Sequence, residues 1–368
     1  MIYTEDKLRE VIGGVLPLDK EAMSAAEKRQ AELAKPPGSL GKLEDISIQL
    51  AGITGRVHNT VDKRRIIVMA ADNGVYEEGV SVSPQSVTLA QTINLTKGIT
   101  GCSTLAKHFG CEVRVCDVGV NAVIKCPDVI NRKIAMGTKN IAKEPAMTRQ
   151  QAVQAILTGV EMADIAASES VDIIGVGEMG ICNTTTSSAV LAALTRKSAV
   201  EVTGKGGGVT DEAFARKKAV IEGAIEKHKP NADDPVDVLS KVGGFDICAM
   251  CGVFIGAAKN RIPVVVDGFI SIVAALCAVR LCPNARGYLI PSHQSYERGF
   301  VVASRELEFD AYLLLGMRLG EGSGCPLAFE IVDAACSVIN EMATFAEAEI
   351  NDDYLDEIRG KDDSFTVE

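Results

Sequence analysis

Short, continuously apolar segments alternate with helical stretches along most of the chain after residue 60. These segments lack the polar–apolar alternation of a strand that has one face in water. Continuous apolar runs are typical of strands buried on both faces, and strands separated by helices indicate βαβ units in a parallel sheet. The pattern predicts strands within residues 64–74, 111–120, 171–178, 261–269, 286–295 and 309–324.

The two ends of the chain have a different, helical pattern. Residues 1–34 are charged and amphipathic, and the pattern stops at Pro36 and Pro37, because proline cannot continue a helix. A second helix follows, and an Ala-rich amphipathic stretch and an acidic tail end the chain. We predict the α/β class, with a Rossmann-like parallel sheet flanked by helices and a smaller helical domain from both ends. The predicted boundaries are 1–60 and 326–368 for the helical domain and 61–325 for the α/β domain.

Composition narrows the classes of partner. The 368 residues are 47% hydrophobic and carry a formal net charge of −11, without a basic stripe, so we expect no nucleic acid as a partner. The longest apolar runs, such as 268–279, are too short for a membrane span, and the charged N-terminus does not resemble a signal peptide. We therefore expect a soluble, cytoplasmic protein that does not bind membranes.

Cysteine and histidine usage favours reduced thiols and no metal site. The 11 cysteines are scattered through apolar runs, and the single C-x-x-C, at Cys248 and Cys251, lies in a helical apolar segment that predicts a core pair. The four histidines are far apart, without the close spacing of zinc ligands. The sequence thus predicts no metal and no cofactor.

Polar residues follow the apolar runs at their carboxyl ends. They are Asp72, Asn73, Asp117, Glu178, Asp267, Ser292, His293 and Glu321. In an open parallel sheet these ends share one edge, where ligands bind. The sequence therefore predicts one site lined by carboxylates and small polar groups, although some of these acids could instead cap helices.

Residues 175–180 read G-V-G-E-M-G and allow two interpretations. The three glycines match the G-x-G-x-x-G of a dinucleotide loop, which would make the chain an NAD-dependent dehydrogenase. However, Glu178 lies inside the glycine frame, and no clear acidic partner for the ribose follows about 20 residues later. The alternative is a turn that places a carboxylate in a site.

Three further segments suggest chemistry. The run "NTTTSS" from Asn183 can cap a helix and offer donors to an anion, and the glycine loop in 203–212 suits close approach to a phosphate. In "RLGEGSG" from Arg318, glycines flank Glu321 and leave room for a small planar substrate. A carboxylate shielded from water can have a raised pKa and act as a base near neutral pH.

Together these segments resemble the nicotinate-nucleotide–dimethylbenzimidazole phosphoribosyltransferase family over nearly the whole chain. The resemblance depends on seven ordered segments: "KPPGSLGKLE", "AADNGVYEEGVSVSP", "GVGEMGICNTT", "KPNADDPVDVLSKVGG", "IPVVVDGFISIVAAL", "PSHQSYERG" and "LGMRLGEGSG". It implies transfer of the 5-phosphoribosyl group of nicotinate mononucleotide to 5,6-dimethylbenzimidazole or a related base. The products are nicotinate and α-ribazole 5′-phosphate, for the nucleotide loop of cobamides, and the family is usually homodimeric. The apolar helix at 268–279 is one candidate for an interface.

The resemblance also implies roles for residues. Glu321 matches the base that takes the acceptor proton, and Glu178 matches a second carboxylate that favours positive charge at the anomeric carbon. Substrate-binding candidates are Ser83, Gln91, Met179, Gly180, Asn183, Thr184, Gly204, Gly206, Lys217, Ser292, Arg318 and Leu319. Among them Ser83 and Gln91 belong to the benzimidazole pocket, Met179 and Leu319 to its walls, and the 204–208 loop, Lys217 and Ser292 to the phosphate.

The chain departs from the family pattern at four positions near the expected site. Asn73 stands where many members have His, and Cys182 stands where Gly or Ala is common. Thr186 stands where many members have Pro after "NTT", and Asp246 stands where Glu is more usual. These differences bear on the acceptor, so a phenol or adenine remains an alternative to a benzimidazole. A non-catalytic subunit is disfavoured by the presence of both carboxylates.

Overall fold

The computed structural model describes residues 3–204, 208 and 210–355. The chain divides into two compact units. The larger comprises residues 1–17 and 62–329, and the smaller comprises 18–61 and 330–368. We describe each unit by itself.

The larger unit is built on a six-stranded sheet in which every strand pair is parallel. Its order is β3-β2-β1-β4-β5-β6, which confirms the predicted Rossmann-like α/β class. The strands are β1 (Arg64–Ala71), β2 (Glu112–Gly119), β3 (Val129–Asn131), β4 (Ile173–Met179), β5 (Val264–Val266) and β6 (Leu289–Pro291). Strand β4 is buried along its whole length, as the continuous apolar pattern indicated.

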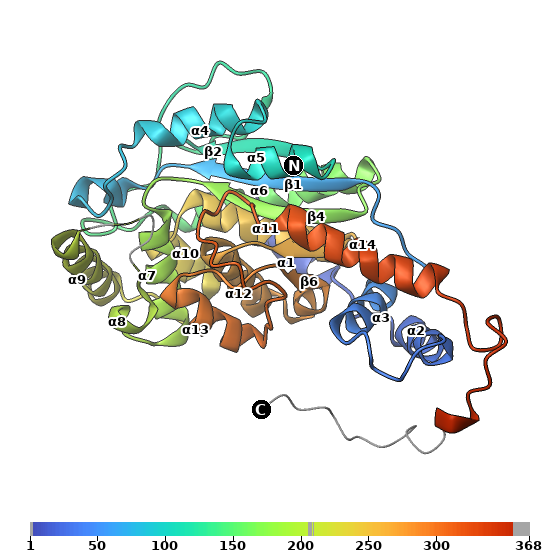
Figure 1. Cartoon of the computed structure of the whole chain (residues 1–368). Coiled ribbons are helices and arrows are strands. Elements are labelled where there is room, and N and C mark those ends of the chain that lie inside the picture. The colour runs from blue at the N-terminus through green and yellow to red at the C-terminus, as the bar shows by residue number, and fades with distance from the viewer. Residues whose placement is uncertain (1–2, 205–207, 209, 356–368) are drawn as a thin grey trace. The chain divides into compact units, whose positions relative to one another are not determined.

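Helices flank both faces of this sheet (Figure 1). α4 and α5 contact β2 on one face, whereas α11 contacts β1 and β4 on the other and is itself covered by α6. The α-helices of this unit are α1 (Glu5–Gly13), α4 (Ser86–Thr96), α5 (Gly101–His108), α6 (Arg149–Ser168), α7 (Asn183–Thr195), α8 (Ala199–Val202), α9 (Asp211–His228), α10 (Pro235–Val242), α11 (Phe245–Lys259), α12 (Phe269–Leu281) and α13 (Arg298–Leu307). The 3₁₀ helices are η1 (Gly74–Glu78) and η2 (Pro283–Tyr288).

Local sequence explains where several helices begin. α6 starts after Thr148, whose hydroxyl accepts from the Gln151 amide while the Gln151 side chain accepts from the Thr148 amide. α10 starts after Asp234, with Pro235 in its first turn. Residues 245–258 of α11 are all buried. The two C-x-x-C thiols, Cys248 and Cys251, therefore lie in the hydrophobic core, as predicted.

The prediction of a strand within 309–324 is wrong. This segment is a loop in which only Leu313 forms an isolated bridge, to His293. Leu314 and Leu315 are 76% and 57% exposed, and the backbone takes positive φ at Gly316 and again from Gly320 to Gly322. The apolar run therefore lies on the surface, where its glycines bend the chain too often for a strand. The short strand β3 was not predicted.

Helix α12 does not offer the interface suggested by its apolar sequence. Residues Phe269 to Ala278 are all buried within the larger unit. This helix contacts strands β4 and β5 and helices α7, α11 and α13. Its small apolar side chains are therefore needed for the core.

Residues 1–17 lie with the sheet unit, whereas the sequence pattern placed them in the helical domain. Leu8 and Val11 of α1 are buried, and α1 contacts α6 and α11. The hydroxyl of Tyr288 donates to the Leu16 carbonyl at 2.9 Å. Burial of the apolar face of α1 against the larger unit accounts for this placement.

The smaller unit is helical. It contains α2 (Lys20–Glu32), α3 (Lys42–Thr54), the 3₁₀ helix η3 (Asp353–Leu355) and most of α14 (Cys325–Glu341). Ala26, Ala51 and Ile339 form its small core, and the Gln30 amide donates to the Ser47 hydroxyl inside it. Within residues 3–204, 208 and 210–355, no helix is long and apolar enough to span a membrane.

Candidate active site

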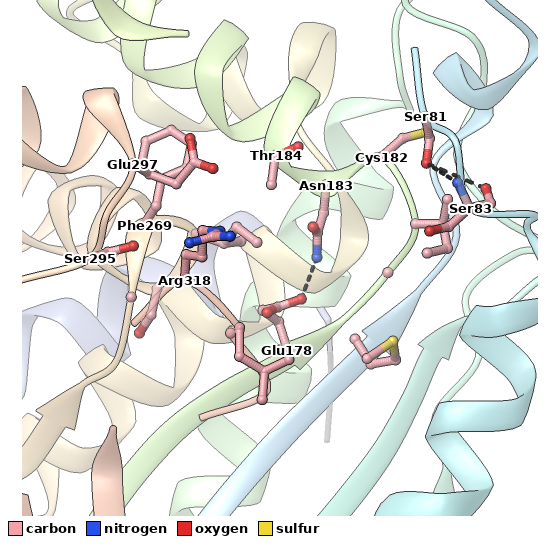
Figure 2. A pocket seen from close by; sticks show the side chains of 18 of the residues that line it. Ser81, Ser83, Glu178, Cys182, Asn183, Thr184, Phe269, Ser295, Glu297 and Arg318 are labelled. Carbon is pink, nitrogen blue, oxygen red and sulfur yellow. Dashed lines mark hydrogen bonds between the residues drawn. The ribbon is translucent and has the colours of Figure 1, made fainter. Parts of the chain in front are cut away.

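A cavity opens at the carboxyl ends of the strands, beside the point where the strand order reverses between β1 and β4 (Figure 2). This is the position where open α/β sheets bind ligands. The cavity measures about 190 Å³, whereas a single water needs only about 10–15 Å³, so it suits a small ligand. Of the predicted site residues it is lined by Ser83, Glu178, Met179, Gly180, Asn183, Thr184, Lys217, Arg318 and Leu319.

Glu178 lies near the end of β4 and is buried. Its Oε1 accepts from the Glu321 amide at 3.1 Å, and its Oε2 accepts from Asn183 Nδ2 at 2.5 Å. Figure 2 shows the Asn183 side chain pointing down to this carboxylate. Burial raises the pKa of Glu178 to about 8, with a further rise from Asp246 and Asp267. The group can therefore exchange a proton near neutral pH.

Asn183 joins Glu178 to a second buried carboxylate. Its Nδ2 also donates to Asp246 Oδ2 at 3.0 Å, so one amide group bridges two acids. Burial raises the pKa of Asp246 to about 7. Asn183 begins α7, and the cavity-lining residues 180–182 form the turn that leads into this helix.

Lys217 supplies a buried cation at the same helix end. It lies on α9, and its Nζ donates to the Thr184 hydroxyl at 2.8 Å. Burial lowers its pKa to about 8, against a rise caused by Glu297. A lysine ammonium next to the first turn of a helix is a favourable environment for an anion such as a phosphate.

Serine hydroxyls and a thiol line another part of the cavity. Ser81, Ser83 and Cys182 lie together on one side in Figure 2, whereas Ser295, Glu297 and Phe269 lie on the other. Cys182 has a positive φ of 74°, and burial raises its thiol pKa to about 12, so the sulfur remains protonated. The cavity thus has serine hydroxyls on both of these sides, and Lys217 adds a cation to its lining.

Glu321 is buried but does not line the cavity. Its backbone amide donates to Glu178, while its side-chain Oε2 accepts from the Cys102 amide in the first turn of α5 at 3.1 Å. Its neighbours Leu319 and Gly320 do line the cavity. The two predicted residues are therefore joined through the backbone amide of Glu321, whereas the Glu321 side chain lies behind the cavity wall.

Three other predicted residues also lie off the cavity. Gln91 is on α4 and accepts from Asn94 at 3.0 Å, and the Ser292 hydroxyl donates to the Val266 carbonyl at 2.7 Å. Gly204 lies beside the cavity wall, because an added Cβ there would meet Oε2 of the lining residue Glu297 at 1.9 Å. Gly206 is outside the described residues.

Sequence reasoning missed part of the lining. Asp267 was noted only as one of several acids after a strand, and Glu297, Ser295 and Phe269 were not singled out. Asp267 directly follows β5, so strand ends were a usable signal for it. The other three lie in two of the segments that carried the resemblance, 262–276 and 291–299, but only the tertiary structure brings them together at the cavity.

The glycines of G-V-G-E-M-G do not form a dinucleotide cradle. Gly175 and Gly177 lie inside β4 instead of in the turn after it. An added Cβ would come within 2.6 Å of Cys325 at Gly175, 2.4 Å of the Glu321 carbonyl at Gly177 and 2.3 Å of the Ala71 carbonyl at Gly180. These glycines allow neighbouring segments to approach β4 closely, which favours the interpretation as a turn that places a carboxylate.

The four departures from the family pattern gather around the start of α7. The Thr186 hydroxyl donates to Asn73 Oδ1 at 3.3 Å, and Asn73 Nδ2 donates to the Ile181 carbonyl at 3.4 Å. Cys182 lines the cavity, and Asp246 accepts from Asn183. They therefore form one connected group that shapes this end of the site. Among the described residues, no group of three or more His, Cys, Asp or Glu side chains is arranged to hold a metal ion.

Comparison with known proteins gives a consistent result. A family model described as phosphoribosyltransferase matches residues 15–350. The nicotinate-nucleotide–dimethylbenzimidazole phosphoribosyltransferase of Clostridium perfringens is 52% identical over 355 residues, covering 96% of this chain and 98% of the relative. The protein of the same name from Clostridium tetani is 46% identical over 362 residues, covering 98% and 100%.

Solved structures agree with this result. CobT from Thermus thermophilus superposes with a TM-score of 0.87 at 36% identity, covering 90% of this chain and 99% of that chain. The nicotinate-nucleotide–dimethylbenzimidazole phosphoribosyltransferase structure from the same organism gives a TM-score of 0.86 at 35% identity, with 91% and 99% covered. The chain belongs to the nicotinate-nucleotide–dimethylbenzimidazole phosphoribosyltransferase family.

Proposed function

We propose that this chain transfers the 5-phosphoribosyl group of nicotinate mononucleotide to 5,6-dimethylbenzimidazole, giving α-ribazole 5′-phosphate and nicotinate for the cobamide nucleotide loop. One observation carries the proposal: a buried carboxylate, Glu178, lies in a cavity that has a buried cation, Lys217, and a cluster of hydroxyls. The reaction needs all three in one site: a cation for the phosphate, a carboxylate near the anomeric carbon and hydrogen-bonding groups for the aromatic acceptor. The names of the relatives support the same reaction.

The phosphate binds at the start of α7. The Lys217 ammonium and the Thr184 hydroxyl are already joined at 2.8 Å, and the N-terminus of α7, the positive end of the helix dipole, lies at the same place. Gly204 and Gly208 belong to the adjoining glycine loop, and Gly208 lines the cavity. Because the Ser292 hydroxyl donates to the Val266 carbonyl, away from the cavity, we assign phosphate binding mainly to Lys217 and Thr184.

Glu178 acts on the ribose. As the bond between C1′ and the pyridine nitrogen of nicotinate breaks, its electron pair stays on that nitrogen and positive charge grows at C1′. A deprotonated Glu178 favours this charge. Its pKa of about 8 falls when the cationic pyridinium ring of the donor binds beside it, since an opposite charge favours the ionised form.

The acceptor binds against Ser83, Met179 and Leu319, with Gln91 at the neighbouring helix α4. One ring nitrogen forms the new bond to C1′ on the face opposite the leaving nicotinate, so the β-nucleotide gives an α-product. The proton of the other ring nitrogen passes to the Glu321 carboxylate, which turns from the Cys102 amide toward the acceptor. The pyridinium is already a good leaving group, so the proposed transfer assigns no step to a metal or cofactor.

A product assay tests the reaction. The purified chain is incubated with nicotinate mononucleotide and a panel of benzimidazoles, adenine and phenols, and each riboside is identified by mass and chromatography. We expect α-ribazole 5′-phosphate from 5,6-dimethylbenzimidazole. Release of nicotinate only with a phenol or adenine would instead support the alternative acceptors, and no release with any acceptor would contradict the proposal.

Glu321→Gln tests the proposed base. We expect this variant to lose most turnover while it still binds nicotinate mononucleotide. Glu308→Gln is the matched control, because Glu308 also has a positive φ, of 52°, but lies on the surface at the end of α13. Equal turnover of the two variants would contradict the role of Glu321.

We propose further that the chain is a homodimer in the cytoplasm. Tyr296, Leu314 and Leu315 are 75%, 76% and 57% exposed, and neighbouring exposed apolar side chains are typical of interaction surfaces. All 11 cysteines lie in the described part of the chain, where none forms a disulfide, and this favours a reducing compartment. Light scattering after size exclusion tests the dimer, because a monomer mass at micromolar concentration would contradict it. Fractionation of the native host tests the location, because recovery of the protein outside the cytoplasm would contradict it.

A further inference from the structure

The loop that carries Glu321 has an unusual backbone. Gly320, Glu321 and Gly322 follow one another with φ of 85°, 62° and 88°. A non-glycine residue at such a φ is strained and persists only where its surroundings hold it. What holds this loop therefore determines where the Glu321 side chain lies.

Asp267 provides that hold. It directly follows β5, is only 2% exposed, and both of its carboxylate oxygens accept hydrogen bonds from the loop backbone. Oδ2 accepts from the Gly322 amide at 3.1 Å, and Oδ1 accepts from the Gly324 amide at 2.7 Å. Hydrogen bonds from amides to a buried carboxylate are among the stronger ones in proteins.

Gly322 and Gly324 have no side chains, so Asp267 holds the loop through their backbone amides. An added Cβ would meet Ile66 at 2.9 Å from Gly322 and His293 Nδ1 at 2.2 Å from Gly324. The loop is thus pressed against the sheet edge, with no room for side chains at these positions. The amides of both glycines reach Asp267 because of this close approach.

Glu321 directly precedes the two anchored glycines. Its own amide donates to Glu178, and its carboxylate accepts from the Cys102 amide. We infer that Asp267 is a positioning residue for the transfer: by holding the amides of Gly322 and Gly324 it fixes the backbone of Glu321 and hence the place of its carboxylate. This inference depends on the proposed role of Glu321 as the base.

Asp267 also lines the cavity, so direct contact with a substrate is the competing explanation. A double-mutant cycle separates the two. We expect Asp267→Asn to lower kcat at least 10-fold with the KM for nicotinate mononucleotide within threefold, because an amide side chain keeps only one acceptor oxygen for the two loop amides. In a Glu321→Gln background the same substitution should change the residual kcat less than threefold. Equal losses in both backgrounds would overturn the inference.

Hydrogen exchange tests the anchor without any activity. Deuterium uptake of peptides that cover residues 318–326 should rise at least fivefold in Asp267→Asn. Asp72→Asn is the matched control, since Asp72 is a buried carboxylate after β1 that accepts from the Asn121 amide instead, so uptake at 318–326 should not change. If Asp267→Asn does not fold, Asp267→Ser offers a smaller polar side chain for the same measurement.

The outcomes distinguish this inference from the proposed function. Unchanged uptake at 318–326 in the folded Asp267 variant overturns the anchor, whatever the activity. Raised uptake, in a chain whose unsubstituted form makes no riboside, supports the anchor and contradicts the proposed function.

Discussion

Gly320→Ala should disturb the site more than the same change four residues earlier. Both Gly320 and Gly316 have positive φ, 85° and 64°, and both lie in the loop before Glu321. An added Cβ meets nothing within 4 Å at Gly316, but it would lie 2.3 Å from Glu178 Oε1 at Gly320. The pair therefore separates backbone strain from a steric effect on the carboxylate.

The magnitude follows from these distances. The left-handed backbone costs an alanine roughly 1–2 kcal/mol at either position. Ordinary contact begins at 3.4 Å, so Glu178 must withdraw by about 1 Å in Gly320→Ala, which breaks its 3.1 Å hydrogen bond from the Glu321 amide. Since the raised pKa keeps Glu178 largely protonated near neutral pH, the loss is that of leaving the buried Glu321 amide without an acceptor, which costs about 1–3 kcal/mol in addition.

Urea unfolding and steady-state kinetics measure both effects. We expect Gly316→Ala to lower the free energy of unfolding by about 1–2 kcal/mol and to leave kcat nearly unchanged. Gly320→Ala should lower the free energy of unfolding by about 1–3 kcal/mol more and reduce kcat about 5- to 150-fold, if the same amount is lost in the transition state. Identical stability and kcat of the two variants would refute the reasoning.

Two further predictions concern the buried ionisable groups. Because burial raises the pKa of Glu178 from 4.5 to about 8, the folded state holds a proton that the unfolded state has released, and stability falls as pH rises between these values, by up to about 1.4 kcal/mol per pH unit. Urea unfolding between pH 5.5 and 7.5 should show a shallower fall in Glu178→Gln, and equal slopes would contradict the raised pKa. Lys217→Met should raise the KM for nicotinate mononucleotide at least 10-fold with a smaller change in kcat, since it removes the buried cation beside Thr184. Lys218→Met is its control, because Lys218 lies over the Phe214 ring on the same helix, and a similar KM for both variants would argue against a phosphate at Lys217.

The apolar pattern predicted the sheet because burial on both faces requires a recognisable sequence. Strands β1, β2, β5 and β6 fall within predicted runs, β4 extends one residue beyond its run, and the residues after them meet at one edge. The inference from an apolar run to a buried strand failed for Leu314 and Leu315, because an apolar residue can also lie on the surface. In that segment the glycines, with their positive φ, decided the structure.

The candidate site divides in the same way. The sequence by itself determined that carboxylates such as Glu178 and Asp267 stand at strand ends, because the position of a residue after a strand fixes its edge of the sheet. Only the tertiary structure decided that Asp267 binds the amides of the distant 322–324 segment, and that Glu321 faces Cys102. These contacts join residues far apart in the chain through backbone amides. Because every residue type except proline carries such an amide, the identity of the donor residue does not predict which acceptor it meets.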